Sequence, residues 1–111
     1  MASDITTQAA AESAEDLAKR FAELAARWRR DTLYSSRVKD MTDHPGYREI
    51  VAMGERAVPL ILADLEKEAD HWFVALYRIT GLNPIPKEDA GKIKKMAAAW
   101  IAWGREQGYR W

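Results

Sequence analysis

Apolar residues recur at helical spacing along most of the chain, beginning after a short polar N-terminus. The first set recurs at intervals of four, three and four residues: Leu17, Phe21, Leu24 and Trp28. This spacing places them on one stripe of a helix, and Ser13, with Asp16 three residues later, predicts where that helix begins. We therefore expect a one-sided helix lying on the core, preceded by a mobile tail over residues 1–12.

Prolines predict the starts of two further helices. Pro45 opens a short helix that ends near Gly54, and Pro59 opens a second one. The apolar residues of the second helix fall within an arc of about 100°: Val58, Ile61, Leu62, Leu65 and Ala69. Asp70 is expected to cap the helix that follows. Residues 31–42 have a weak pattern that fits a broken helix or a loop.

The segment 71–80 is apolar on almost every side of a helical wheel. Trp72, Leu76 and Ile79 line one face, and Phe73, Tyr77 and Thr80 line the next; Val74 and Ala75 extend the apolar surface beyond them. Only His71 and Arg78 form a polar stripe. A helix of this kind has neighbours on nearly every side. We therefore expect a central helix whose aromatic rings are enclosed and which ends at Gly81.

A last helix is predicted after Pro86, with Asp89 or Gly91 near its start. Its apolar face comprises Ile93, Met96, Ala97, Trp100, Ile101 and Gly104. No alternating strand pattern and no Asn-Gly or Asp-Gly hairpin turn occurs in the sequence. The predicted fold is all-α, a compact bundle of four to six helices forming a single domain over residues 13–111.

The helix pair over residues 54–81 resembles a HEAT-type helical repeat. The residues that carry the resemblance are Gly54, Ala57-Val58-Pro59, Leu62, Leu65, Ala75-Leu76, Ile79 and Gly81. The resemblance implies an antiparallel helix hairpin at the centre of the bundle, and a scaffold that binds other macromolecules. Only one clear unit is present, whereas HEAT-type proteins stack several. A wider set is similar to small bacterial all-α proteins, a likeness that implies no activity: His44-Pro45, Met53-Gly54, His71-Trp72-Phe73, Thr80-Gly81, Trp100 and Trp103-Gly104.

The composition narrows the class of protein. Seventeen basic and seventeen acidic side chains cancel, so no net charge draws the chain towards nucleic acid or anionic lipid. The absence of Cys excludes disulfides and thiolate sites and fits a reducing compartment. No apolar run of about eighteen residues that could span a membrane, and no secretory signal, is present. We expect a cytoplasmic protein without a membrane partner.

Candidate catalytic and metal-binding residues are sparse. His44 and His71 are the two histidines, and their spacing matches no zinc signature. Ser35-Ser36 lacks the glycines of a nucleophile elbow, and no glycine-rich phosphate loop exists. The acids fall mainly on predicted solvated faces, whereas general acid–base catalysis needs a partly desolvated group. We expect no metal, no cofactor, no small-molecule substrate and no enzymatic activity.

Two basic clusters support an alternative function, nucleic-acid binding. They comprise Arg27, Arg29 and Arg30 near the end of the first helix, and Lys92, Lys94 and Lys95 near the start of the last. Residues 71–111 carry seven basic and three acidic groups, whereas residues 50–70 carry two basic and five acidic ones. The same side chains also fit ordinary solvated helix faces, and no recognition-helix signature is present.

The aromatic residues near the C-terminus suggest a protein-binding surface. Trp28, Trp72 and Trp100 lie at the centres of apolar faces and are predicted to be core. Exposed Trp, Tyr and Arg dominate binding hot spots, so the predicted partner-binding residues are Trp103, Arg105, Tyr109, Arg110 and Trp111. A tail that seals the domain is the alternative interpretation. Our main hypothesis is a non-enzymatic helical module that binds a protein partner or itself. An antitoxin- or immunity-like inhibitor or an adaptor in bacteria is one form of it.

Overall fold

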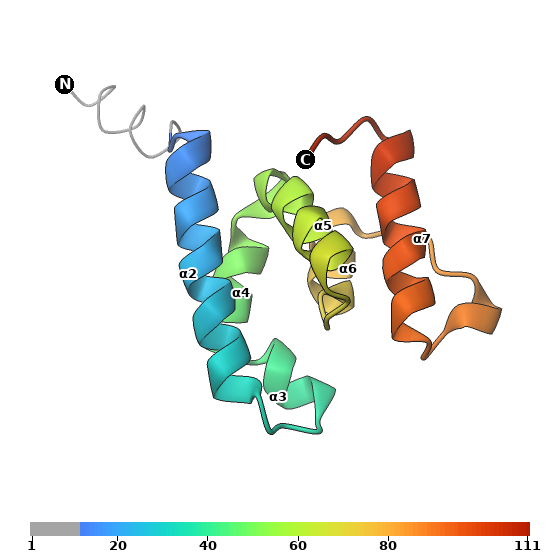
Figure 1. The fold of residues 1–111 in the computed structure, drawn as a ribbon, viewed down its shortest axis with the longest axis horizontal. Coiled ribbons are helices and arrows are strands. Elements are labelled where there is room, and N and C mark those ends of the chain that lie inside the picture. The colour runs from blue at the N-terminus through green and yellow to red at the C-terminus, as the bar shows by residue number, and fades with distance from the viewer. Residues whose placement is uncertain (1–11) are drawn as a thin grey trace.

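The fold is built from helices alone over the part of the chain that the structure describes, residues 12–111 of a computed structural model. Six α-helices, two short 3-10 helices and no β-strand occur in these residues. Figure 1 shows α2 along one side of the molecule and α7 along the other, with the shorter helices between them. The prediction of an all-α bundle of four to six helices is confirmed.

The predicted tail, residues 1–12, lies outside the described residues except for Glu12. The Glu12 carboxylate pairs with Arg20 at 2.8 Å. Its backbone carbonyl accepts a hydrogen bond from the Arg56 guanidinium at 2.6 Å. Glu12 is thus tied to the domain that we expected to begin at Ser13.

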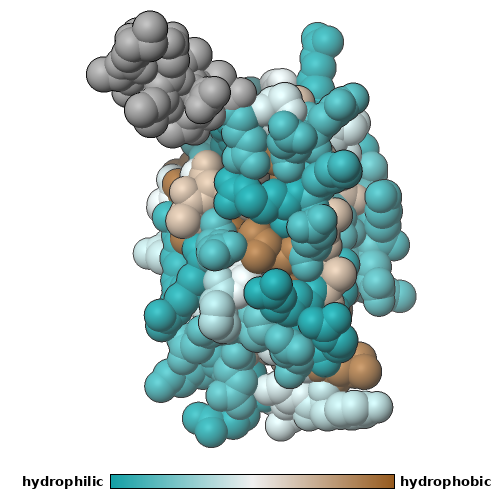
Figure 2. All heavy atoms as spheres, turned by 90° about the vertical axis from the view of Figure 1, so that its left-hand side faces the viewer, coloured by the Kyte–Doolittle hydropathy of each residue, from teal (hydrophilic) through white to brown (hydrophobic). Residues whose placement is uncertain are grey.

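Helix α2 (Ala14–Thr32) has the predicted start and the predicted buried stripe. The Ser13 hydroxyl accepts a hydrogen bond from the backbone N–H of Asp16 at 3.0 Å, which satisfies one of the free donors at a helix N-terminus. The buried residues of α2 are Leu17, Phe21, Leu24, Ala25 and Trp28. Its other side faces solvent, and the view onto the α2 side of the molecule in Figure 2 is dominated by hydrophilic residues.

Two short helices, α3 (Val38–Thr42) and α4 (Pro45–Ala52), follow α2, so the weakly patterned segment 31–42 is a broken helix. The His44 ring caps α4, because its Nδ1 accepts a hydrogen bond from the N–H of Gly46 at 3.0 Å. Helix α4 crosses α2 closely at Gly46, where a Cβ atom would lie 3.2 Å from the carbonyl oxygen of Leu24. Gly54, with φ 70°, ends this segment as predicted and begins the 3-10 helix η1 (Gly54–Ala57).

Helices α5 (Val58–Lys67) and α6 (Phe73–Thr80) form the pair that resembles a HEAT-type repeat. They contact each other, and the resemblance itself stays a prediction. The prediction that Asp70 caps α6 is wrong, because the helix starts only at Phe73. The Asp70 carboxylate instead accepts hydrogen bonds from Arg29 at 3.0 Å and from the backbone N–H of His71 at 2.8 Å. Arg29 lies in α2, far from Asp70 in the sequence, and binds the carboxylate that the local sequence pattern had assigned to the helix start.

The prediction that segment 71–80 is enclosed on nearly every side is only half right. Trp72, Ala75 and Leu76 are fully buried, but Tyr77 is 56% exposed and Phe73 is half-buried. The reason is the placement of α7 (Ile93–Glu106), which packs mainly on α5 and leaves one side of α6 uncovered. The indole at position 72 is core, whereas the opposite side of α6 is a surface.

Helix α7 follows the 3-10 helix η2 (Lys87–Asp89) and buries Ala97, Trp100 and Gly104. Gly104 lies so close to Leu62 of α5 that a Cβ atom would collide with the leucine side chain. After a left-handed turn at Gly108, the C-terminus folds back towards α5 (Figure 1). Among the described residues, no helix combines the length and the apolar character needed to cross a membrane.

Candidate functional site

Four aromatic side chains form a closed cluster at the centre of the fold: Phe21, Trp28, Tyr47 and Trp72. The ring centroid of Trp72 lies 4.5 Å from that of Trp28, and Trp72 stacks on Tyr47 at 5.7 Å with an interplanar angle of 10°. Trp28, Tyr47 and Trp72 are each at most 1% exposed. The cluster joins α2, α4 and the residue before α6, so we assign it to the core.

The indole donors of this cluster have partners. The N–H of Trp72 donates to Oδ2 of Asp64 at 2.7 Å, and the N–H of Trp28 donates to the backbone carbonyl of Met41 at 2.9 Å. A buried donor without a partner destabilises a fold by about 1–3 kcal/mol. These two bonds remove that penalty at the centre of the molecule.

Tyr47 adds a second polar link within the cluster. Its hydroxyl donates to the carbonyl of His71 at 2.9 Å and accepts from the backbone N–H of Ala75 at 2.8 Å. Burial raises the pKa of Tyr47 well above its usual value, because the ionised form would be poorly solvated there. Tyr47 therefore fixes the start of α6 and is not a candidate base.

The Arg29 guanidinium is engaged by acidic side chains of the same chain. Its guanidinium donates to both carboxylate oxygens of Asp64 and to Oδ2 of Asp70, the latter at 3.0 Å. Burial opposes the charge of Arg29, but the hydrogen bonds to Asp64 and Asp70 outweigh it and raise the pKa of the guanidinium. Arg29 thus holds α2 against α5 and the segment that precedes α6.

The six residues of the alternative nucleic-acid patch do not form one surface. They are Arg27, Arg29 and Arg30 in α2, and Lys92, Lys94 and Lys95 at the start of α7. Helices α2 and α7 lie on opposite sides of the molecule (Figure 1). Arg29 is engaged by two carboxylates, and Arg30 pairs with Asp31 at 3.6 Å. The structure therefore has two separate basic clusters, each smaller than the combined patch.

The predicted partner-binding residues gather at the C-terminal end of the molecule: Trp103, Arg105, Tyr109, Arg110 and Trp111. Trp103 is half-buried, with its ring centroid 5.2 Å from that of Trp100 and 5.7 Å from that of Tyr109. Arg105 lies 5.4 Å from the ring centroid of Trp111 and pairs with Glu66. The indole N–H of Trp111 also donates to Glu66, at 3.2 Å. These contacts agree with the alternative interpretation, in which the tail seals the domain.

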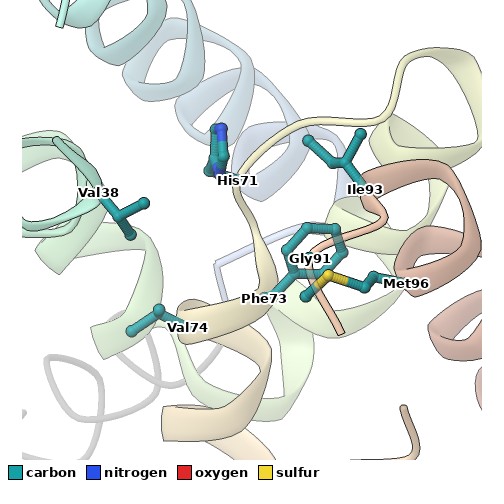
Figure 3. Close-up of a pocket in the computed structure, with 7 residues that line it drawn as sticks. All are labelled: Val38, His71, Phe73, Val74, Gly91, Ile93 and Met96. Atoms are coloured by element: carbon teal, nitrogen blue, oxygen red, sulfur yellow. The ribbon is translucent and has the colours of Figure 1, made fainter. Parts of the chain in front are cut away.

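An apolar hollow of about 260 Å³ opens between the starts of α6 and α7. Figure 3 shows Val38 and Val74 on one side of it and Ile93 and Met96 on the other. A second hollow, of about 190 Å³, continues past Tyr77 and Trp100. The two hollows share three lining residues, Phe73, Val74 and Met96. We call the combined feature the α6–α7 groove.

The residues of the α6–α7 groove are ones that the sequence analysis did not select as a site. The sequence did contain a signal for this groove, because segment 71–80 is apolar on more sides than the core can cover. We interpreted this excess as complete burial, whereas it reflects one buried side and one groove-facing side. Val38, which belongs to a short helix with little pattern, carried no such signal.

Trp100 links this groove to the core. It is 1% exposed and lines the second hollow. Its indole N–H has no hydrogen-bond partner among the described residues. The indole donors of Trp28 and Trp72 both have partners. The core is therefore less completely hydrogen-bonded on the Trp100 side of the molecule.

A third hollow, of about 280 Å³, gathers polar side chains between α2 and the segment before α6. Arg29 and Asp70 line it but are bound to each other. Ser35 and His71 also line it, yet the Ser35 hydroxyl is directed to the carboxylate of Asp40 and to a backbone carbonyl. A nucleophile paired with a base, as covalent catalysis requires, is not formed by these side chains. Among the described residues, no cluster of three or more metal-ligating side chains occurs.

No family model, no curated protein and no solved structure matches the chain. The functional proposal therefore rests on the geometry of the molecule itself. In that geometry the α6–α7 groove differs from the aromatic cluster, because its side chains are only partly covered by the rest of the chain. It differs from the C-terminal tail because it is an apolar hollow, whereas Arg105 and Trp111 of the tail contact each other and Glu66.

Proposed function

We propose that the chain is a non-enzymatic helical protein–protein interaction module whose partner-binding surface is the α6–α7 groove. The observation that carries the proposal is the groove itself, a continuous apolar hollow whose walls include Tyr77 and Val38, 56% and 46% exposed. Exposed apolar side chains that line a groove offer a surface on which the side chains of another molecule can pack. The groove is lined mostly by apolar side chains and has few polar groups that could orient a small molecule, so side chains of a protein partner fit it better.

In this role the chain acts by occupying a partner's surface, as an adaptor or as an inhibitor of the antitoxin or immunity type. The cysteine-free sequence suits a reducing compartment, and the proposal places the module in the cytoplasm. We do not propose the C-terminal aromatic residues that we first selected as the main partner-binding surface. Most of them already contact the domain, because Trp111 donates a hydrogen bond to Glu66 and Trp103 packs against Trp100.

A matched pair of tyrosine variants tests the proposal. Tyr77→Asp places a charge in the wall of the groove, whereas Tyr34→Asp places the same charge at a position that is 96% exposed and lines none of the hollows described above. Wild type and both variants are compared by affinity capture from the organism that encodes the chain, and by analytical ultracentrifugation for self-association. Wild type and Tyr34→Asp are expected to retain the same partner, and Tyr77→Asp to lose it.

Thermal unfolding of both variants verifies that each still folds. Identical capture by all three proteins, or monomeric behaviour at high concentration with no captured partner, would overturn the proposal.

A further inference from the structure

The His44 side chain is held at both of its ring nitrogens, by two different helices. Its Nδ1 accepts a hydrogen bond from the backbone N–H of Gly46, in the first turn of α4, at 3.0 Å. Its Nε2 lies 2.8 Å from Oδ2 of Asp31, in the last turn of α2. The side chain is only 11% exposed. His44 therefore joins the end of α2 to the start of α4.

These two contacts fix the protonation state of the ring. A backbone N–H can only donate, so Nδ1 of His44 offers its lone pair and carries no proton. The one ring proton of the neutral imidazole is then on Nε2, which donates it to the carboxylate of Asp31. The arrangement therefore requires the neutral form of His44 with its proton on Nε2.

The acid form of histidine is incompatible with the first of these contacts. An imidazolium carries a proton on each nitrogen and accepts no hydrogen bond, so the Nδ1–H would meet the N–H of Gly46. The positive end of the α4 dipole also disfavours a cation at this position. The contact with Asp31, in contrast, becomes an ion pair between opposite charges. Protonation thus exchanges the cap of α4 for a stronger link to α2.

Asp31 is the one charged side chain that bonds to the His44 ring among the described residues. The hydrogen bond from His44 is the main reason that the pKa of Asp31 is lowered, so Asp31 remains a carboxylate where histidines titrate. Asp31 also pairs with Arg30 at 3.6 Å, and Asp43 pairs with Arg48 at 3.9 Å. Other charged residues on the elements packed against α4 make no ion pair with the ring: Arg27 and Arg29 in the last two turns of α2, Lys39 and Asp40 in α3, Glu55 and Arg56 in η1, and Arg78 in α6.

Gly46 has little room to find another partner when this cap is lost. It is buried, and a Cβ atom there would lie 3.2 Å from both the His44 ring and the carbonyl oxygen of Leu24. A buried N–H without an acceptor is unfavourable, so the start of α4 has to shift or open to water. The next residue, Tyr47, binds the first turn of α6 through the N–H of Ala75. A shift at Gly46 therefore extends to the start of α6.

We infer that His44 is a proton-operated switch at the start of α4. In the neutral form the ring caps α4 and is bonded to α2. In the protonated form it is paired with Asp31 alone, and the start of α4 is released. Histidine is the side chain that ordinarily changes charge between pH 5 and 8, so mild acidification operates the switch. The switch acts on the fold and does not depend on a partner in the α6–α7 groove.

A nuclear magnetic resonance titration of the full chain from pH 8 to pH 5 tests the inference. Long-range proton–nitrogen spectra of the imidazoles report which nitrogen carries the proton, and amide spectra report the hydrogen bond of Gly46. At pH 8 His44 is expected with its proton on Nε2. On acidification the amide proton of Gly46 should move upfield in step with the His44 ring. Its protection against hydrogen exchange, relative to the intrinsic rate at each pH, should fall by about five-fold, as the loss of a helix cap predicts.

The two histidines of the chain supply matched variants. His44→Asn keeps an acceptor for the N–H of Gly46, because Asn is a good N-cap residue, but it has no proton to gain in this pH range. The Gly46 amide is therefore expected to stay nearly constant in His44→Asn. His71→Asn removes the other histidine, which is hydrogen-bonded through its backbone only, and should leave the wild-type response intact. Thermal unfolding at pH 7 verifies that both variants fold, and the wild-type titration decides if either does not.

Three results would overturn the inference: a proton on Nδ1 of His44 at pH 8, a Gly46 amide that does not respond while the His44 ring titrates, or the same response in His44→Asn as in wild type. A His44 ring that stays neutral down to pH 5 would also overturn it. Loss of the Gly46 response in His71→Asn, with His44 intact, would assign the switch to the other histidine and refute the role of His44.

Discussion

Trp72 and Trp100 are equally buried, at 0% and 1% exposure, but they belong to regions that are built differently. Trp72 is surrounded by aromatic rings, and its indole N–H donates to Asp64 at 2.7 Å. Trp100 lines a surface hollow, and its N–H has no partner among the described residues. Exposure alone would place both in the same category.

The comparison shows that two side chains of equally low exposure can differ in whether their polar atoms have hydrogen-bond partners. Around Trp72, α2 and α4 supply aromatic rings and α5 supplies the Asp64 carboxylate, so both apolar and polar groups are covered. Around Trp100, α7 meets α5 on one side only, so apolar side chains of α6 and α7 remain partly open. The first region accounts for the fold of the domain, and the second is where we place its partner.

The largest expected effect comes from truncating the closed cluster. Trp72→Ala is expected to lower the free energy of unfolding by about 3–5 kcal/mol, because it leaves a cavity among three aromatic rings. Urea denaturation measures the change. Trp111→Ala, at a residue 37% exposed, is the control and should lower it by about 1 kcal/mol or less. Similar losses in both variants would contradict the assignment of Trp72 to the core.

Replacing each buried tryptophan by phenylalanine sharpens the comparison directly. Both changes remove a similar volume, but Trp72→Phe also breaks a hydrogen bond to the Asp64 carboxylate, a type of bond that contributes about 1.5–3 kcal/mol. Trp72→Phe should therefore be the more destabilising of the two by about that amount. Equal losses in urea denaturation would show that the N–H of Trp100 finds a partner in solution.

A smaller loss is expected when the Tyr47 hydroxyl is removed. Tyr47→Phe leaves the N–H of Ala75 without an acceptor in the core, which should lower the free energy of unfolding by about 1–3 kcal/mol. Amide hydrogen exchange at Ala75 should accelerate with it. Tyr34→Phe, at a side chain 96% exposed, should change neither quantity, and unaltered exchange at Ala75 in Tyr47→Phe would refute the bond.

The smallest effect is a dependence on alkaline pH. Burial raises the pKa of Tyr47 in the folded protein, whereas an unfolded tyrosine ionises near pH 10. The contribution of Tyr47 to stability is therefore complete below about pH 10 and falls above it, by at most about 1.4 kcal/mol per pH unit. Urea denaturation between pH 8 and pH 11 should show a steeper decline in wild type and Tyr34→Phe than in Tyr47→Phe. Identical slopes in all three would contradict the prediction.

The features that the sequence predicted correctly depend on residues close together in the chain. The buried stripe of α2, the start at Ser13 and the stop at Gly81 each follow from side chains within about one or two helical turns. The placement of Asp70 failed for the complementary reason. Its partner Arg29 lies 41 positions away, and no local pattern reports such a contact.

The amino-acid sequence by itself determined that this chain is helical and that segment 71–80 has more apolar surface than one neighbour can cover. Only the tertiary structure decided which part of that surface is buried, because coverage depends on where α7 packs. Helix α7 settles on α5, where Gly104 admits Leu62 at close range. The side of α6 that it leaves open, with Phe73, Val74 and Tyr77, becomes the groove.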